Sequence, residues 1–89
     1  MTFTEKYFFE EIRRFRDAFG NKEWWKKSEE QRDAWISGLS LVYLNINNED
    51  GTNPTKEQIN KWATIFQVTV EEYERRKLFM LMHALKVGA

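Results

Sequence analysis

Apolar side chains recur along this chain at the spacing of α-helices. Residues 3–19 carry one such stripe, which contains Phe8, Ile12, Phe15 and Phe19. Residues 29–46 carry a second inner stripe, which contains Trp35, Leu39, Val42 and Ile46. Side chains three or four residues apart share one face of a helix, so both stripes predict amphipathic helices that bury one side.

The second half of the chain predicts two further helices. The first covers residues 55–66, and its inward face would consist of Ile59, Trp62, Ala63 and Phe66. The second covers residues 70–86, and its inward face would consist of Val70, Leu78, Leu81 and Leu85. A turn at Gln67-Val68-Thr69 would separate the two helices.

Short polar side chains mark where these helices would begin. A Thr or Ser followed three residues later by Glu or Gln forms a capping box, and such boxes start at Thr2, Ser28, Thr55 and Thr69. Because each box precedes an apolar run of helical period, the four together favour an all-α fold. Residues 39–44 leave one alternative open, since their β-branched and aromatic side chains also suit a short buried strand.

The segment at residues 45–54 is dense in Asn, Asp and Gly, which bond their own backbone and favour loops. We therefore predict an all-α compact bundle of four helices, in which two helical hairpins are joined by this Asn/Asp/Gly loop. A length of 89 residues suits one helical domain over residues 1–89.

Charge and composition narrow the choice of partners. Fourteen basic residues balance fourteen acidic ones, so the chain as a whole has no electrostatic attraction to nucleic acid or to an anionic membrane. The longest uncharged stretch, residues 34–48, is too short for a membrane span, and the first residues do not resemble a secretory signal. We therefore expect a protein that does not bind membranes. The absence of cysteine suits a reducing compartment, so we expect a cytoplasmic location.

Few residues suggest catalysis or metal binding. His83 is the single histidine, and the four glycines are too scattered to form a phosphate-binding loop. Neighbouring carboxylates such as Glu71 and Glu72 point about 100° apart on a helix and do not converge. We therefore predict no enzymatic activity, no catalytic residues, no metal, no cofactor and no small-molecule substrate.

The segment 77–85, Lys-Leu-Phe-Met-Leu-Met-His-Ala-Leu, is apolar on more than one side of its predicted helix. A helix with apolar residues on opposite sides is either surrounded in its own bundle or in contact with another chain. Rings and Met side chains outside the core stripes are common at protein interfaces, so we predict that a partner contacts Phe9, Trp24, Trp25, Tyr73, Phe79, Met80 and Ala84. For the residues of the first and last helices, complete burial within one chain is the alternative. For Trp24 and Trp25 the alternative is that one of them caps the core between the first two long helices while the other lies half exposed.

These observations favour a non-enzymatic protein–protein interaction module acting through an apolar face of the C-terminal helix. We expect a small regulator, an inhibitor or a subunit of an intracellular assembly. The partner would be another protein or a second copy, and a homodimer through the C-terminal helix is the simplest version.

A second hypothesis rests on the two helices predicted at residues 55–66 and 70–86. With the small Ala63 and the Val68-Thr69 turn, this part of the chain resembles a helix-turn-helix. The resemblance implies a DNA-binding transcriptional regulator whose phosphate contacts come from Arg75, Arg76 and Lys77. Against it, Gln67 stands where a turn Gly is usual, and Glu71 and Glu74 would lie on the DNA-facing surface.

Overall fold

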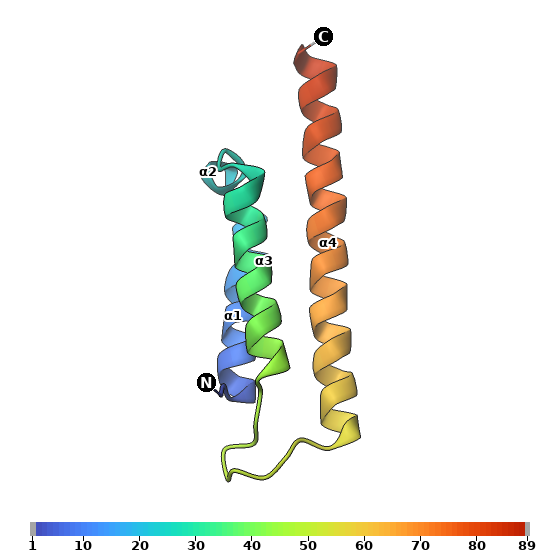
Figure 1. Ribbon diagram of the computed structural model, residues 1–89. Helices are drawn as coiled ribbons and strands as arrows, with labels where there is room; N and C mark the ends of the chain where they lie inside the picture. The colour runs from blue at the N-terminus through green and yellow to red at the C-terminus, as the bar shows by residue number, and fades with distance from the viewer. Residues whose placement is uncertain (1, 89) are drawn as a thin grey trace.

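The computed structural model describes the backbone of residues 2–88 and the side chains of residues 2–83. Most of this backbone is helical, in four elements: α1 (Glu5–Ala18), α2 (Lys22–Trp25), α3 (Glu29–Leu44) and α4 (Lys56–Gly88) (Figure 1). The predicted all-α fold is therefore confirmed. The ambiguous segment 39–44 is helical and forms the last turns of α3.

Helices α1, α3 and α4 pack side by side, with α1 behind α3 and α4 beside them in Figure 1. The loop between α3 and α4 lies at one end of the bundle. With 33 residues α4 is about 50 Å long, whereas α3 with 16 residues is about 24 Å long. The last turns of α4 therefore extend past the other helices.

Aromatic side chains dominate the buried core. The predicted stripe of α1 is buried throughout, and Leu39, Val42 and Ile46 of the second stripe are buried with it, while Trp35 is half-buried. Trp24 joins the core from α2, and Trp62 and Tyr73 join it from α4. The predicted inner faces of the first two helices are therefore confirmed.

Two of the four predicted capping boxes are present. Gln31 and Ser28 bond each other's backbone at the start of α3, and Gln58 and Thr55 do the same at the start of α4. The prediction at Thr2 is wrong, because Phe3 pairs with the loop after α3 instead of entering the helix. Its N–H donates to the Asn45 carbonyl at 2.9 Å, and its carbonyl accepts from the Asn47 N–H at 2.9 Å.

The predicted turn at residues 67–69 is also wrong, since α4 continues through it without a break. Thr69 does not cap a helix. Its hydroxyl donates to the Ile65 carbonyl at 2.7 Å, and its side chain is only 1% exposed. No Gly or Pro occurs between residues 55 and 87, so nothing interrupts the helical hydrogen bonds. The two helices predicted here are one, the second hairpin is not formed, and the fourth helix is the short α2.

The buried side of α4 also differs from the prediction. It carries Trp62, Thr69 and Tyr73, whereas Leu78 and Leu81, expected in the core, are exposed. The physical reason is the length of α4. The other helices end at about the level of Lys77, which contacts Glu29 at the start of α3, so most of the described side chains beyond Lys77 are exposed. The prediction for Leu85 lies outside the described side chains.

Candidate protein-interaction site

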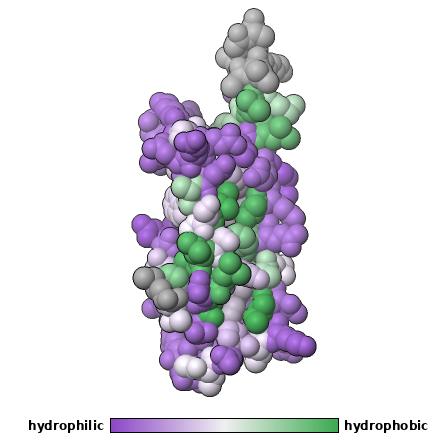
Figure 2. Space-filling view, viewed as in Figure 1, coloured by the Kyte–Doolittle hydropathy of each residue, from purple (hydrophilic) through white to green (hydrophobic). Residues whose placement is uncertain are grey.

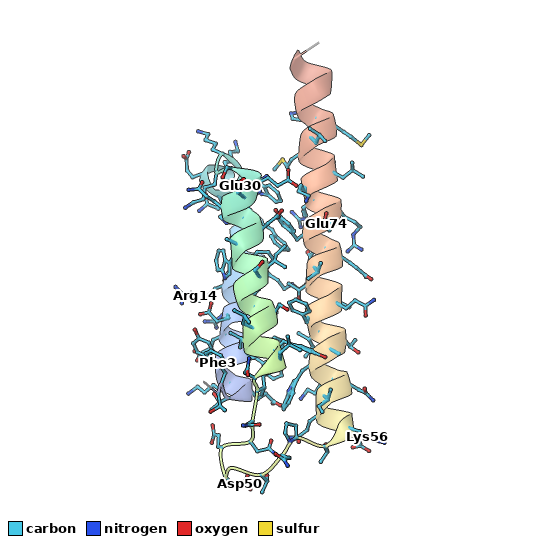
Figure 3. The ribbon with its side chains drawn as sticks, viewed as in Figure 1. Phe3, Arg14, Glu30, Asp50, Lys56 and Glu74 are labelled. Atoms are coloured by element: carbon cyan, nitrogen blue, oxygen red, sulfur yellow. The ribbon has the colours of Figure 1, made fainter. Side chains whose placement is uncertain are left out.

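The C-terminal turns of α4 lie beyond the end of the bundle. Glu74 lies near the level of Glu30, at the start of α3, and α4 continues well past this level (Figure 3). Tyr73 is the last described residue of α4 that belongs to the buried core. The residues that follow it have few neighbours from other helices.

These turns are apolar and exposed. We call Leu78, Phe79, Met80, Leu81 and Met82 the apolar end of α4. Met80 is half-buried, and the other four side chains are between 56% and 66% exposed. Figure 2 shows hydrophobic side chains on this part of α4, next to the hydrophilic surface formed by the start of α3. Because consecutive residues point in different directions, the apolar end offers apolar surface on several sides of the helix.

An open cleft of about 530 Å³ lies at the base of the apolar end. Trp25, Glu29 and Arg32 form one wall, from the end of α2 and the start of α3. Residues of α4 form the other wall, and they are Glu74, Lys77, Leu78, Met80 and Leu81. The cleft therefore combines an apolar lining with charged groups at its edge.

Lys77 ties α4 to the start of α3 at this edge. Its ammonium group lies 3.0 Å from Glu29 and 3.2 Å from Glu74, and 5.3 Å from the centre of the Tyr73 ring. Partial burial by itself lowers the pKa of Lys77, but hydrogen bonds to Glu29 and Glu74 outweigh this effect and raise the pKa above its ordinary value. Lys77 is therefore a fixed cation at the boundary between the bundle and the apolar end.

Tyr73 does not lie on a partner surface, so this part of the predicted site is wrong. Its side chain is 0% exposed and packs against Phe15, Phe19, Trp24 and Trp25. Its hydroxyl donates to Asp33 at 2.9 Å and accepts from Arg32 at 3.3 Å. Burial raises the pKa of the Tyr73 phenol above its ordinary value. This ring is central to the core, because side chains from α1, α2 and α3 all contact Tyr73.

The two tryptophans of the predicted site differ in position. Trp24 is buried between Phe15 and Phe19, so it belongs to the core rather than to a partner surface. Trp25 is half-buried, and its Nε1–H donates to the Phe19 carbonyl at 2.8 Å. It also lines the cleft below the apolar end, so Trp25 is the tryptophan that a partner can reach.

The remaining predicted residues are spread over the molecule. Phe9 is half-buried on α1 with the Lys61 ammonium 5.3 Å from its ring centre, far along the bundle from the apolar end. Phe79 is exposed and stacks on the imidazole of His83, with ring centroids 6.4 Å apart. Ala84 lies outside the described side chains. Of the predicted partner residues, the structure brings together Trp25 and Met80, which line the same cleft, while Phe79 is exposed elsewhere on the apolar end.

The helix-turn-helix hypothesis loses its structural basis, since no turn separates residues 66 and 70. Its three proposed phosphate contacts also differ in their surroundings. Arg76 lies 3.9 Å from Glu72, and Lys77 is held by two carboxylates. Arg75 is exposed on the same helix. An uninterrupted helix that packs along the bundle cannot place a separate recognition helix in a DNA groove.

Other chemistry is limited in the described part of the chain. Among residues 2–83 no group of three or more His, Asp or Glu side chains is arranged to hold a metal ion. The described portion also has no helix that combines the length and the apolar character needed to cross a membrane.

The sequence interpretation missed that Leu78 and Leu81 are exposed, because it assigned them to a core stripe. One feature of the sequence could have corrected this interpretation. Residues 55–87 contain no Gly or Pro to end a helix, so they can form one long helix. A helix of that length must extend beyond α1 and α3, which have only 14 and 16 residues.

Comparisons of this chain with protein-family models, with curated proteins and with solved structures each found no match.

Proposed function

We propose that this chain is a non-enzymatic protein–protein interaction module, a small regulator, inhibitor or assembly subunit that binds through the apolar end of α4. One observation carries the proposal. Four large apolar side chains stand more than half exposed on a helix that continues past its partners. The partner is another protein or a second copy of the chain, and self-association is the simplest form.

The energetic argument is that most of the apolar surface of Leu78, Phe79, Leu81 and Met82 is in contact with water rather than with other side chains. Moving a large apolar side chain from water into an apolar contact is worth about 1.5–3 kcal/mol. The four exposed residues together therefore offer several kcal/mol to any partner that covers them. A short projecting helix is also marginal by itself, since about 12–15 residues are needed for an isolated helix to form in water. A partner that covers the apolar end stabilises these turns as well.

Light scattering tests the self-association form. The parent chain is expected at twice the 10.8 kDa of one chain, and Phe79→Glu and Leu81→Glu are expected to return it to the mass of one chain. Both residues are exposed, so the variants keep the fold, which circular dichroism and the melting temperature check. A parent that stays at the mass of one chain at every concentration contradicts self-association.

A paired capture experiment tests the form with a different partner. Immobilised parent chain and immobilised Phe79→Glu are exposed to the same cell extract from the source organism. A protein retained by the parent and lost by the variant supports binding through the apolar end. If both chains retain the same proteins, or neither retains any, the apolar end is not the binding site.

A further inference from the structure

A second surface of the molecule is apolar without an assigned role, along the groove between α3 and the first half of α4. Two open clefts of about 560 and 330 Å³ lie on it. The first is lined by Ile36, Ser37, Ser40, Leu41, Phe66 and Val70. The second continues toward the loop, past Leu44 and Ile59. None of the residues that line the two clefts is charged, in a chain of which 31% is charged.

We call this surface the α3–α4 face. Leu41 and Leu44 are 62% and 72% exposed on it, and Ile59 is also exposed. Figure 2 shows hydrophobic side chains gathered along the middle of the view, where α3 and α4 meet. One chain thus has two uncovered apolar surfaces, the α3–α4 face and the apolar end of α4.

The two surfaces are continuous along α4. Positions 59, 63, 66, 70, 74, 77 and 81 follow one another at intervals of three or four residues, so they share one stripe of the helix. Between Ile59 and Leu81 this stripe is apolar apart from Glu74 and Lys77. These two charges have opposite signs and mark the boundary between the α3–α4 face and the apolar end.

The charges on this stripe favour a second copy of the chain in antiparallel orientation. Two α4 helices that run side by side in parallel register would place Glu74 against Glu74 and Lys77 against Lys77. Within one chain Lys77 already contacts Glu74 at 3.2 Å and Glu29 at 3.0 Å. In an antiparallel pair with its two-fold axis between residues 75 and 76, each Glu74 also lies next to the Lys77 of the other copy, so these contacts are extended across the pair without like charges meeting. The same register places Leu81 of each copy against Val70 of the other.

Resting on the proposed function, we infer that the chain forms an antiparallel homodimer in which the apolar end of each copy docks on the α3–α4 face of the other. The segment from residue 78 to residue 88 is about 16 Å long, which is shorter than the α3 helix beside which it would lie. Two-fold symmetry uses the same contact twice, so in both copies the apolar end and the first cleft of the α3–α4 face are covered. In this register the second cleft, with Leu44 and Ile59, lies beyond the reach of the other copy's α4.

The test places a charge on the α3–α4 face, far from the apolar end. Leu41→Glu and Ser37→Glu are expected to raise the dimer dissociation constant more than about tenfold, measured by light scattering over a dilution series, because each buries a carboxylate in the contact. Val68→Glu is the matched control, since Val68 is exposed but lies outside both clefts, and it is expected to leave the mass unchanged. Ser37 contributes no apolar packing of its own, so its variant keeps the fold.

The outcomes separate this inference from the proposed function. If Leu81→Glu dissociates the dimer while Leu41→Glu and Ser37→Glu do not, the α3–α4 face is not the docking surface and binding through the apolar end still stands. If all three dissociate it and the control does not, the inference holds. A dimer that survives all three contradicts both.

The relative orientation of the two α4 helices can be measured as the distance between spin labels. The chain has no cysteine, so one introduced cysteine gives one label per copy. In the antiparallel dimer, labels at Met82→Cys lie about 20 Å apart along the helix axis, and labels at Asn60→Cys lie about 45 Å apart. A parallel pair would give one short distance of about 10 Å, the separation of packed helices, at both positions. Equal short distances therefore overturn the antiparallel arrangement.

Discussion

The ring of Trp25 stacks on the ring of Tyr73, with centroids 5.9 Å apart and planes within 11° of each other. This contact fixes the single turn of α2 against α4. Arg32 joins the two residues from α3, since its guanidinium lies 5.3 Å from the Trp25 ring centre and its Nε–H donates to the Tyr73 hydroxyl. The base of the apolar end is therefore held by three helices, although the end itself is uncovered.

The Tyr73 hydroxyl is expected to stabilise the fold. Tyr73→Phe removes its hydrogen bonds to Asp33 and Arg32 and keeps the ring, so the free energy of unfolding should fall by about 0.5–1.5 kcal/mol. Tyr7→Phe is the matched control, because Tyr7 is exposed and its change should stay within about 0.5 kcal/mol. Urea denaturation measures both variants. Equal effects in the two would show that the hydroxyl network of Tyr73 contributes nothing.

Gln67 tests the continuity of α4. In the middle of a helix Gly is about 1 kcal/mol less favourable than Ala, so Gln67→Gly should be less stable than Gln67→Ala by about this amount. Both variants lose the hydrogen bond to Glu71 equally, which makes them a matched pair. A turn at this position would favour Gly instead. A Gly variant as stable as the Ala variant, or more stable, in thermal or urea unfolding would contradict a continuous α4.

Alkaline pH should destabilise the protein through Lys77 and Tyr73. Both groups have pKa values raised by the folded structure, so near pH 10 and above the folded state keeps protons that the unfolded chain releases. The stabilisation is complete below the ordinary pKa values of about 10 and is lost as pH rises through the folded values. The melting temperature should therefore fall with increasing pH above about 10.

The double variant Tyr73→Phe with Lys77→Gln supplies the comparison for this pH dependence. It lacks both groups, so its melting temperature should fall less steeply over the same alkaline range than that of the parent. Identical slopes in the two proteins would show that neither group is linked to folding.

Local patterns predicted those parts of the molecule whose contacts lie within one element or between neighbouring elements. The stripe of α1 from Phe8 to Phe19 and the capping box at Ser28 were both predicted, because each depends on residues only a few positions apart. Thr69 shows the limit of this approach. Its sequence context is that of a helix cap, but the hydroxyl bonds the Ile65 carbonyl inside a continuous helix, and burial of the side chain favours that bond.

The sequence predicted only part of the candidate site, because local patterns do not show which residues other helices cover. The apolar character of residues 78–82 and the exposure of Phe79 agree with the interpretation of the sequence, whereas Tyr73 and Trp24 do not. Helical spacing places Tyr73 on the same side as Met80, but it carries no information about where the neighbouring helices stop. Tyr73 lies within the part of α4 that the other helices cover, and Met80 lies just beyond this part.

By itself the sequence determined the helical character of the chain, the inner stripes of α1 and α3, and a C-terminal segment with apolar residues around the helix. These properties follow from side-chain chemistry and the period of the helix, which act locally. Only the tertiary structure decided which apolar residues are covered, because coverage depends on the unequal lengths of α1, α3 and α4 and on how they align. That alignment buries Tyr73, leaves Leu78, Phe79, Leu81 and Met82 exposed, and leaves an uncharged face between α3 and α4.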